Sequence, residues 1–121
     1  MSDNLFFNTR TMPWEDLGGG VSRQIMGHDD KIMLVKVKFE KGSIGKAHEH
    51  FHSQTSYVVT GTFELTIGNK KQVLQEGDSF YIPPNIIHGA VCLEAGILID
   101  VFSPVRQDFL DGSAVSYFGN K

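Results

Sequence analysis

A short run of histidines is the first chemical signal in this sequence. Residues 46–61 read KAHEHFHSQTSYVVTG, so His48, His50 and His52 stand at every second position and Gln54 follows them. The whole chain contains 5 histidines, which makes this local concentration unusual. Imidazole nitrogens bind zinc, copper, iron, nickel and cobalt, and one ion can be held by several of them. The run therefore indicates a candidate metal site.

The alternation of these histidines gives the site a geometry. In a β-strand, residues two apart point the same way and lie roughly 6.6 Å apart. If this segment is extended, His48 and His50 converge on one ion while Glu49 points to the opposite side. His52 has the same parity, so it either joins the site or only donates a hydrogen bond beside it. Gln54 is either a ligand through its amide oxygen or a partner of a neighbouring strand.

A second candidate cluster lies near the end of the chain. Asp100 stands between two β-branched apolar residues, where desolvation of a carboxylate is costly unless it is paired or functional. Phe102 faces the same side of that strand, and Arg106 follows shortly after. An arginine can clamp a carboxylate, an aromatic ring can pack on a sugar, and an aspartate can move a proton. The alternative is a structural ion pair between Asp100 and Arg106.

The segments that must position these residues have the periodicity of strands. Residues 35–40 alternate apolar and charged side chains. Residues 62–74 also alternate apolar and polar side chains around a Gly68-Asn69 turn, which predicts a hairpin. Further strands are predicted at 21–27, 55–61, 79–83, 88–93 and 97–104. Only residues 12–17 and 106–112 could hold a helical turn. The pattern predicts an all-β fold, a small sandwich or barrel.

Composition limits the class of protein. A chain of 121 residues makes one domain, and a net charge of −3 gives no reason to expect nucleic acid or a membrane as a partner. No apolar run approaches the ~20 residues that span a bilayer. The N-terminus lacks the pattern of a signal peptide, so we expect a cytoplasmic protein. The single cysteine, Cys92, lies in an apolar run and is interpreted as a buried hydrophobic residue.

The spacing of the glycines and histidines resembles the paired motifs of the cupin superfamily, in which two His and one Glu of the first motif and one His of the second bind a metal. The matching positions are Gly42, His48, His50, Gln54 and Gly61, then Gly77, Pro83, Asn85 and His88. The resemblance implies a single cupin jelly-roll barrel (a double-stranded β-helix) over residues 21–121, after an N-terminal arm of residues 1–20. Gln54 departs from the usual Glu, and Asn85 replaces a Gly but tolerates the same left-handed conformation.

Longer stretches are similar to one cupin family, the KdgF pectin-degradation proteins. They are PWEDLGGGVSRQIMG, HEHFHSQTSYVVTGTFELTIG, EGDSFYIPPNIIHGAVCLEAG and LIDVFSPVRQDFL. The resemblance implies linearisation of 4,5-unsaturated monouronates, released by pectate or alginate lyases, to open-chain 5-keto-4-deoxyuronate. It also implies one divalent ion (Ni, Zn, Fe, Co or Mn) and a small anionic sugar as partner. Its metal ligands would be His48, His50, Gln54 and His88, and its catalytic residues Asp100, Phe102 and Arg106.

Gln54 affects which chemistry the site suits. An amide ligand is neutral, so three imidazoles and one amide leave a divalent ion its full charge, which favours an anionic substrate or a developing enolate. A cupin oxygenase acting on a small diketone or phenolic substrate is the first alternative, and it predicts a redox metal and oxygen consumption. A non-catalytic sugar-acid-binding cupin is the second. Cupins are often dimers through exchanged terminal strands, so a homodimer is expected, with residues 5–9 as a candidate arm.

Overall fold

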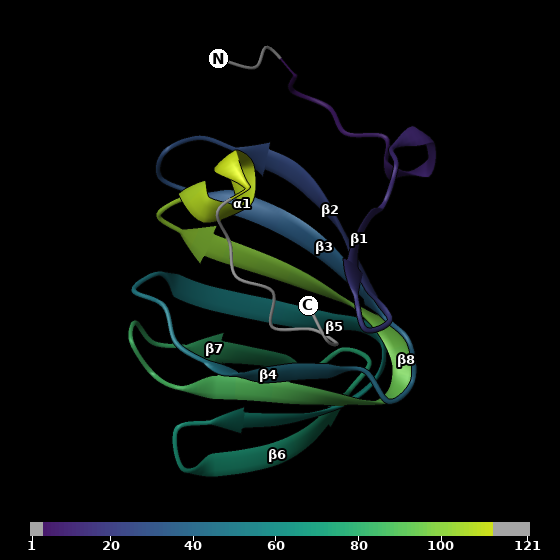
Figure 1. The fold of residues 1–121 in the computed structure, drawn as a ribbon, viewed down its shortest axis with the longest axis vertical. Coiled ribbons are helices and arrows are strands. Elements are labelled where there is room, and N and C mark those ends of the chain that lie inside the picture. Colours follow the sequence, from purple (N-terminus) through teal and green to yellow (C-terminus); the bar gives the residue numbers. More distant parts are fainter. Residues whose placement is uncertain (1–3, 113–121) are drawn as a thin grey trace.

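Strands build nearly all of the structure, a computed structural model that describes residues 4–112 (Figure 1). Their bounds are β1 Glu15–Gly18, β2 Val21–His28, β3 Met33–Phe39, β4 Ile44–His48, β5 Ser53–Ile67, β6 Lys70–Gln75, β7 Ser79–Ile82 and β8 His88–Ser103. A 3-10 turn, η1 Thr9–Thr11, and one short helix, α1 Gln107–Asp111, complete the described elements. The all-β prediction is confirmed, and α1 forms in one of the two segments expected to allow a helical turn. The other, residues 12–17, instead leads into β1.

The strands pair antiparallel and form two facing layers (Figure 1). One layer runs from β1 through β2 and β3 to the second half of β8, the first half of β5 and β7. The other layer contains β4, the first half of β8, the second half of β5 and β6. The predicted hairpin is present, since β5 ends at Ile67 and β6 begins at Lys70.

Two long strands, β5 and β8, belong to both layers, where the sequence pattern had predicted two separate strands in each case. Both bend where Gly61 and Gly96 meet. A Cβ atom on Gly61 would lie 2.6 Å from the Cα of Gly96, and one on Gly96 would lie 2.1 Å from the carbonyl oxygen of Thr60. Gly61 also has φ +89, a conformation that disfavours other residues. The glycines that look like strand breakers are therefore the points at which each strand turns from one layer to the other.

Apolar side chains from both layers fill the space between them. Phe63, Met33, Val35 and Val58 are almost fully buried, and the ring of Phe63 packs edge-on against Phe39 with centroids 5.2 Å apart. Burial of one such side chain contributes about 1.5–3 kcal/mol. Cys92 belongs to this core, as predicted. The cluster gives the functional side chains a rigid support.

The segment before β2 lies on the outer face of its layer. The side-chain amide of Gln24 donates hydrogen bonds to the carbonyl oxygens of Thr9 and Met12, at 3.0 and 3.1 Å. The Lys38 ammonium lies 4.2 Å from the centroid of the Trp14 ring. Trp14 therefore packs on the barrel of its own chain.

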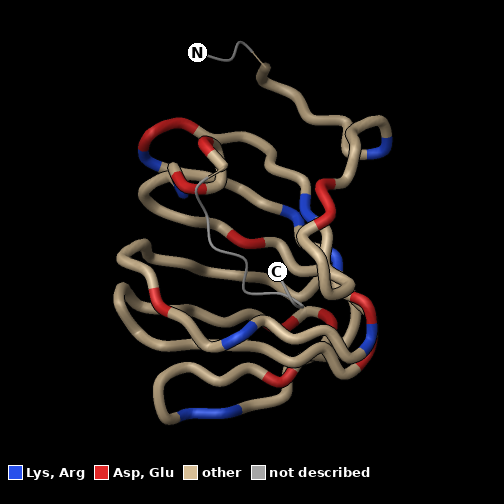
Figure 2. Tube along the Cα trace, viewed as in Figure 1, with Lys and Arg blue, Asp and Glu red and all other residues tan. Residues whose placement is uncertain are grey.

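Charged residues of both signs are interspersed along the chain (Figure 2). Within residues 4–112, no helix combines the length and hydrophobicity that crossing a membrane requires.

Candidate metal centre and cavity

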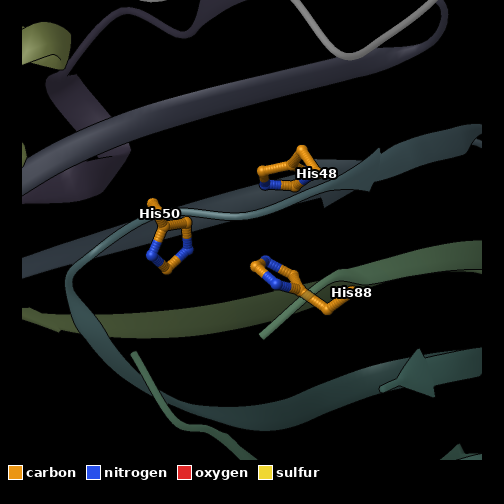
Figure 3. A group of neighbouring side chains, drawn as sticks. All are labelled: His48, His50 and His88. Carbon is orange, nitrogen blue, oxygen red and sulfur yellow. The ribbon is translucent and has the colours of Figure 1, made fainter. Parts of the chain in front are cut away.

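Three histidines from separate segments meet between the two layers (Figure 3). His48 ends β4, His50 lies in the loop after it, and His88 begins β8. One ring nitrogen from each histidine lies within 4.8 Å of the others. The ring centroid of His88 is 4.4 Å from that of His48 and 4.8 Å from that of His50. This convergence is what a shared metal ion requires.

The local structure at His50 differs from the sequence-based expectation. The prediction that His48 and His50 lie on one regular strand is wrong, because β4 ends at His48 and residues 49–52 form a loop. The carbonyl oxygen of His50 accepts a hydrogen bond of 2.8 Å from the backbone N–H of Asn85, which has φ 63. Asn85 thus adopts the predicted left-handed conformation. The loop, and not strand parity, brings His50 to the other two histidines.

Backbone carbonyls fix the tautomer of all three histidines. In each ring, Nδ1 lies within hydrogen-bond distance of a carbonyl oxygen two residues away. The pairs are His48 with Lys46 (2.8 Å), His50 with His52 (3.2 Å) and His88 with Ile86 (2.9 Å). Because a carbonyl only accepts, Nδ1 carries the proton and the lone pair is on Nε2. A second ring nitrogen bonded to a carbonyl is the usual arrangement of a metal-binding histidine.

Burial keeps the imidazoles neutral. It lowers the pKa of His48 and of His50 to about 4, and the positive charge of Arg106 adds to the effect. Burial also lowers the pKa of His88. At neutral pH the three rings therefore offer lone pairs without first losing a proton, as metal binding requires.

The side-chain amide of Gln54 lies beside the three histidines. Its amide N–H donates to the Ser56 hydroxyl oxygen at 3.0 Å, which orients the amide so that Oε1 lies 3.1 Å from Nε2 of His50. Two lone pairs then face each other, a repulsive contact that a shared cation would relieve. Three imidazole nitrogens and one amide oxygen, all neutral, fit one divalent ion.

Asp100 is joined to this donor set through Ser56. The Ser56 hydroxyl donates a hydrogen bond of 2.6 Å to Oδ1 of Asp100, while its oxygen accepts from Gln54. Burial raises the pKa of Asp100 to about 6, against smaller lowering effects of Ser56 and Arg106. The sequence analysis missed Ser56, although its position two residues after Gln54 places it on the same face of β5.

Phe102 and Arg106 form the adjoining wall. Phe102 lies near the end of β8 with its ring 5.9 Å from that of His50. Arg106 is 5% exposed, and its guanidinium carbon lies 5.1 Å from the centroid of Phe102. Its Nε and Nη2 donate to the carboxylate of Asp108 at 3.1 and 2.9 Å. Arg106 therefore forms its ion pair with Asp108, and the expected alternative of a pair with Asp100 is not what the structure shows.

These residues open into one cavity of about 120 Å³. Its lining includes His48, Gln54, His88, Asp100, Phe102 and Arg106. It also includes Arg23 and Phe109, which the sequence analysis did not single out. The two candidate clusters, far apart in sequence, thus share one space.

His52 lies beside the group rather than in it. Its side chain is buried and stacked on Phe51, with ring centroids 3.9 Å apart, and its ring is outside the group of three converging histidines. Its carbonyl oxygen is the partner of Nδ1 of His50. His52 thus contributes to the site through its backbone.

Comparisons with known proteins agree with this geometry. The cupin domain family matches residues 35–102. The pectin degradation protein KdgF of Dickeya dadantii (strain 3937) is 46% identical over 107 residues, which cover 87% of this chain and 97% of the Dickeya protein.

Two solved structures have the same fold and substantial sequence identity. An RmlC-like cupin from Shewanella frigidimarina NCIMB 400 superposes with a TM-score of 0.86 at 48% identity, covering 88% of this chain and 96% of the other. KdgF from Halomonas sp. superposes with a TM-score of 0.84 at 41% identity, covering 88% and 98%. The jelly-roll prediction and the family resemblance are both confirmed, and the chain belongs to the cupin superfamily and, within it, to the KdgF pectin-degradation family.

Proposed function

We propose that this protein linearises 4,5-unsaturated monouronates to open-chain 5-keto-4-deoxyuronate. The observation that carries the proposal is the link from Asp100 through Ser56 to Gln54, which joins a buried carboxylate to a set of converging neutral donors in one cavity. The pectin-degradation name of the Dickeya relative supports a uronate as the substrate class.

The reaction needs only proton movement. In the substrate, the ring oxygen joins a hemiacetal carbon, C1, to an enol-ether carbon, C5. Opening removes the proton of the C1 hydroxyl, breaks the C1–O bond and delivers a proton to C4. C1 becomes an aldehyde and C5 a ketone. Substrate and product are isomers, so the step consumes no oxidant and no organic cofactor.

His48, His50, Gln54 and His88 would hold the divalent ion of the family. When bound there, the ion supplies positive charge that favours a carboxylate or a developing enolate oxygen. Because all four donors are neutral, they leave that charge undiminished. Nickel, zinc, iron, cobalt and manganese all suit this donor set.

Asp100 acts as the acid and base in this proposal. Its pKa of about 6 lies near neutrality, so the carboxylate both accepts and returns a proton at low cost. The hydrogen bond from Ser56 fixes one oxygen, Oδ1, and so orients the carboxyl group toward the cavity that it lines.

Arg106 anchors the substrate carboxylate, and Phe102 supports the sugar ring. Asp108 accepts from Nε and Nη2 of Arg106, and no described residue accepts a hydrogen bond from its Nη1. The Nη1 side of the guanidinium can therefore donate to a carboxylate in the cavity.

The test follows the enol-ether ultraviolet absorbance of an unsaturated monogalacturonate prepared with a lyase. The metal-loaded protein should remove the absorbance faster than the uncatalysed reaction, without oxygen uptake, and chelation should abolish the acceleration. Oxygen uptake coupled to turnover would favour a cupin oxygenase. Saturable binding of the sugar without loss of absorbance would favour a non-catalytic binder.

We also propose a homodimer in which residues 5–9, within the expected N-terminal arm of residues 1–20, contact the second copy. Leu5 and Phe6 are 81% and 86% exposed, so this segment presents apolar side chains that a second copy would cover. Light scattering after size exclusion should give the mass of a dimer, and Leu5→Ser with Phe6→Ser should reduce it to that of a monomer. A wild-type monomer would contradict the proposal.

A further inference from the structure

The ring of Phe109, in α1, contacts two buried guanidinium groups. The central carbon of Arg23 and that of Arg106 each lie 4.1 Å from the centroid of the Phe109 ring. The same ring also packs edge-on against Phe102, with centroids 5.6 Å apart. All four side chains line the cavity, so these contacts form one of its walls.

Each arginine is fixed by a carboxylate of its own. Nε and Nη2 of Arg23 donate to the two carboxylate oxygens of Glu15, at 2.8 and 3.3 Å. Arg106 uses the same two nitrogens on Asp108. Among residues 4–112, no acceptor bonds to Nη1 of either arginine. The two arginines thus have the same arrangement, but only Arg106 belongs to the predicted site.

The burial of Arg23 calls for an explanation beyond stability. Arg23 is 7% exposed, in a wall that already holds a second cation. Burial of a charge is costly even when it is paired, and an apolar residue of similar size often stabilises a protein as well or better. A methionine could fill the space above Phe109, but it would have neither the link to Glu15 nor the attraction to the ring face. These contacts therefore favour a role in function.

We propose that Arg23 is a positioning residue for Arg106. Glu15 of β1 fixes the Arg23 guanidinium, Arg23 holds the Phe109 ring, and the ring holds Arg106 in the orientation that binds a carboxylate in the cavity. Arg23 thereby ties α1 to β2 and, through Glu15, to β1. The identity of the carboxylate rests on the proposed function, whereas the sequence of contacts does not.

A fluorescence experiment tests the contacts without any turnover. Trp14 is the single tryptophan of the chain, so Trp14→Phe with Phe109→Trp places one indole at the shared ring. Arg23→Met in this background should raise acrylamide quenching of that indole, because α1 loses its attachment. Lys38→Met is the matched control, since Lys38 stacks on residue 14 outside the cavity. Equal quenching with and without Arg23→Met would overturn the proposal, whatever the chain catalyses.

A double-mutant cycle tests the coupling to Arg106. Calorimetry measures binding of D-galacturonate to the Ni²⁺-loaded wild type, Arg23→Met, Arg106→Met and the double variant, with metal content checked for each. Arg23→Met should weaken binding about tenfold, as expected for a charged contact that loses its alignment, and should have no further effect in Arg106→Met. Arg23→Lys should recover part of the loss, because it keeps a cation above the ring.

Equal losses in the two backgrounds would overturn the proposal, since Arg23 would then act independently of Arg106. Absence of galacturonate binding to the wild type would overturn it too, because Arg106 would anchor no carboxylate. A chain that shows the coupling but opens no ring would refute the proposed reaction and leave the role of Arg23 intact.

Discussion

The two walls of the cavity are built on opposite principles. On the first, which we call the donor wall, His48, His50, His88 and Gln54 offer neutral donors, and each histidine is oriented by a backbone carbonyl only two residues away. On the second, which we call the arginine wall, the guanidinium groups of Arg23 and Arg106 are held by side-chain carboxylates and both contact the ring of Phe109. The first wall depends on local backbone geometry. The second depends on side-chain contacts, of which the one between Arg23 and Phe109 joins segments far apart in the sequence.

This difference determines how charge is distributed among the side chains around the cavity. The donor wall holds no formal charge at neutral pH, because burial lowers the pKa of its histidines. The arginine wall has each cation balanced by a carboxylate. Between them lies Asp100, with a pKa raised to about 6. A bound ion would thus be the main uncompensated charge in the cavity, which suits an acidic substrate.

The largest effect on turnover should come from substitution of Asp100. Asp100→Asn should lower turnover of the unsaturated uronate by about 10²–10⁴, the usual contribution of a positioned acid or base. Metal content, measured by elemental analysis, should not change, because the amide keeps the size of the side chain. An Asn variant with near wild-type activity would show that Asp100 does not transfer the proton.

Substitution of a single histidine should disable the donor wall. His88→Ala should remove most bound metal and lower turnover by more than about 100-fold, beyond the typical effect of a residue that only supports a ligand. His28→Ala is the control, because His28 is an exposed histidine at the end of β2. Retention of both metal and activity in His88→Ala would separate this cluster from the function.

Loss of the link between the donor wall and Asp100 should have a smaller effect. Ser56→Ala should weaken metal binding by about 10–100-fold, because the Gln54 amide loses the partner that orients its oxygen. Competition with a chromophoric chelator measures the affinity. Ser103→Ala removes an exposed hydroxyl outside the cavity and should leave it unchanged. Unaltered affinity in Ser56→Ala would mean that Gln54 needs no such support.

The smallest effect concerns the stability of the metal-free chain. The folded pKa of His48 and of His50, about 4, lies below the ordinary value of 6.5, so their contribution is complete above pH 6.5 and is lost as the pH falls toward 4. Asp100 opposes this, because its folded pKa of about 6 exceeds 3.8 and its protonation favours the fold. Two imidazoles outweigh one carboxylate, so the free energy of unfolding should be lower at pH 4.5 than at pH 7.

Urea unfolding at pH 7 and at pH 4.5 measures that change. Asp100→Asn should make the fall steeper, because it removes the opposing contribution. Equal stability at the two pH values would indicate that the histidines are not held neutral in the folded chain.

The contrast between the donor wall and the arginine wall also explains which parts of the fold and of the candidate site could be predicted from the sequence. Alternation of apolar and polar residues is enough to indicate strands, and it placed the Gly68-Asn69 hairpin correctly. Donor types and spacing pointed to His48 and His50, even though a loop and not a regular strand positions His50, and the resemblance to the cupin motifs added His88. Periodicity did not reveal that β5 and β8 continue through Gly61 and Gly96, because only the folded chain shows that the two glycines touch.

The arginine wall was harder to predict. Arg106 was expected to pair with Asp100 or to bind substrate. The carboxylate that it contacts is instead Asp108, on the short helix that forms in a segment where only a helical turn was expected. Arg23 occupies an inward position of β2. Glu15 faces it across the β1–β2 pair, but its other partner, Phe109, comes from a distant segment. A pair of this kind leaves no spacing pattern in a single sequence.

The passage of β8 through both layers has a consequence for how the protein folds. His88 opens this strand in one layer, and Asp100 and Phe102 stand near its other end in the second layer. Neither layer alone contains all of the candidate site residues, so an intermediate with only one folded layer would have no complete site. We therefore expect the pocket to form only when the hydrophobic core is complete, and a bound ligand to stabilise the chain against global unfolding.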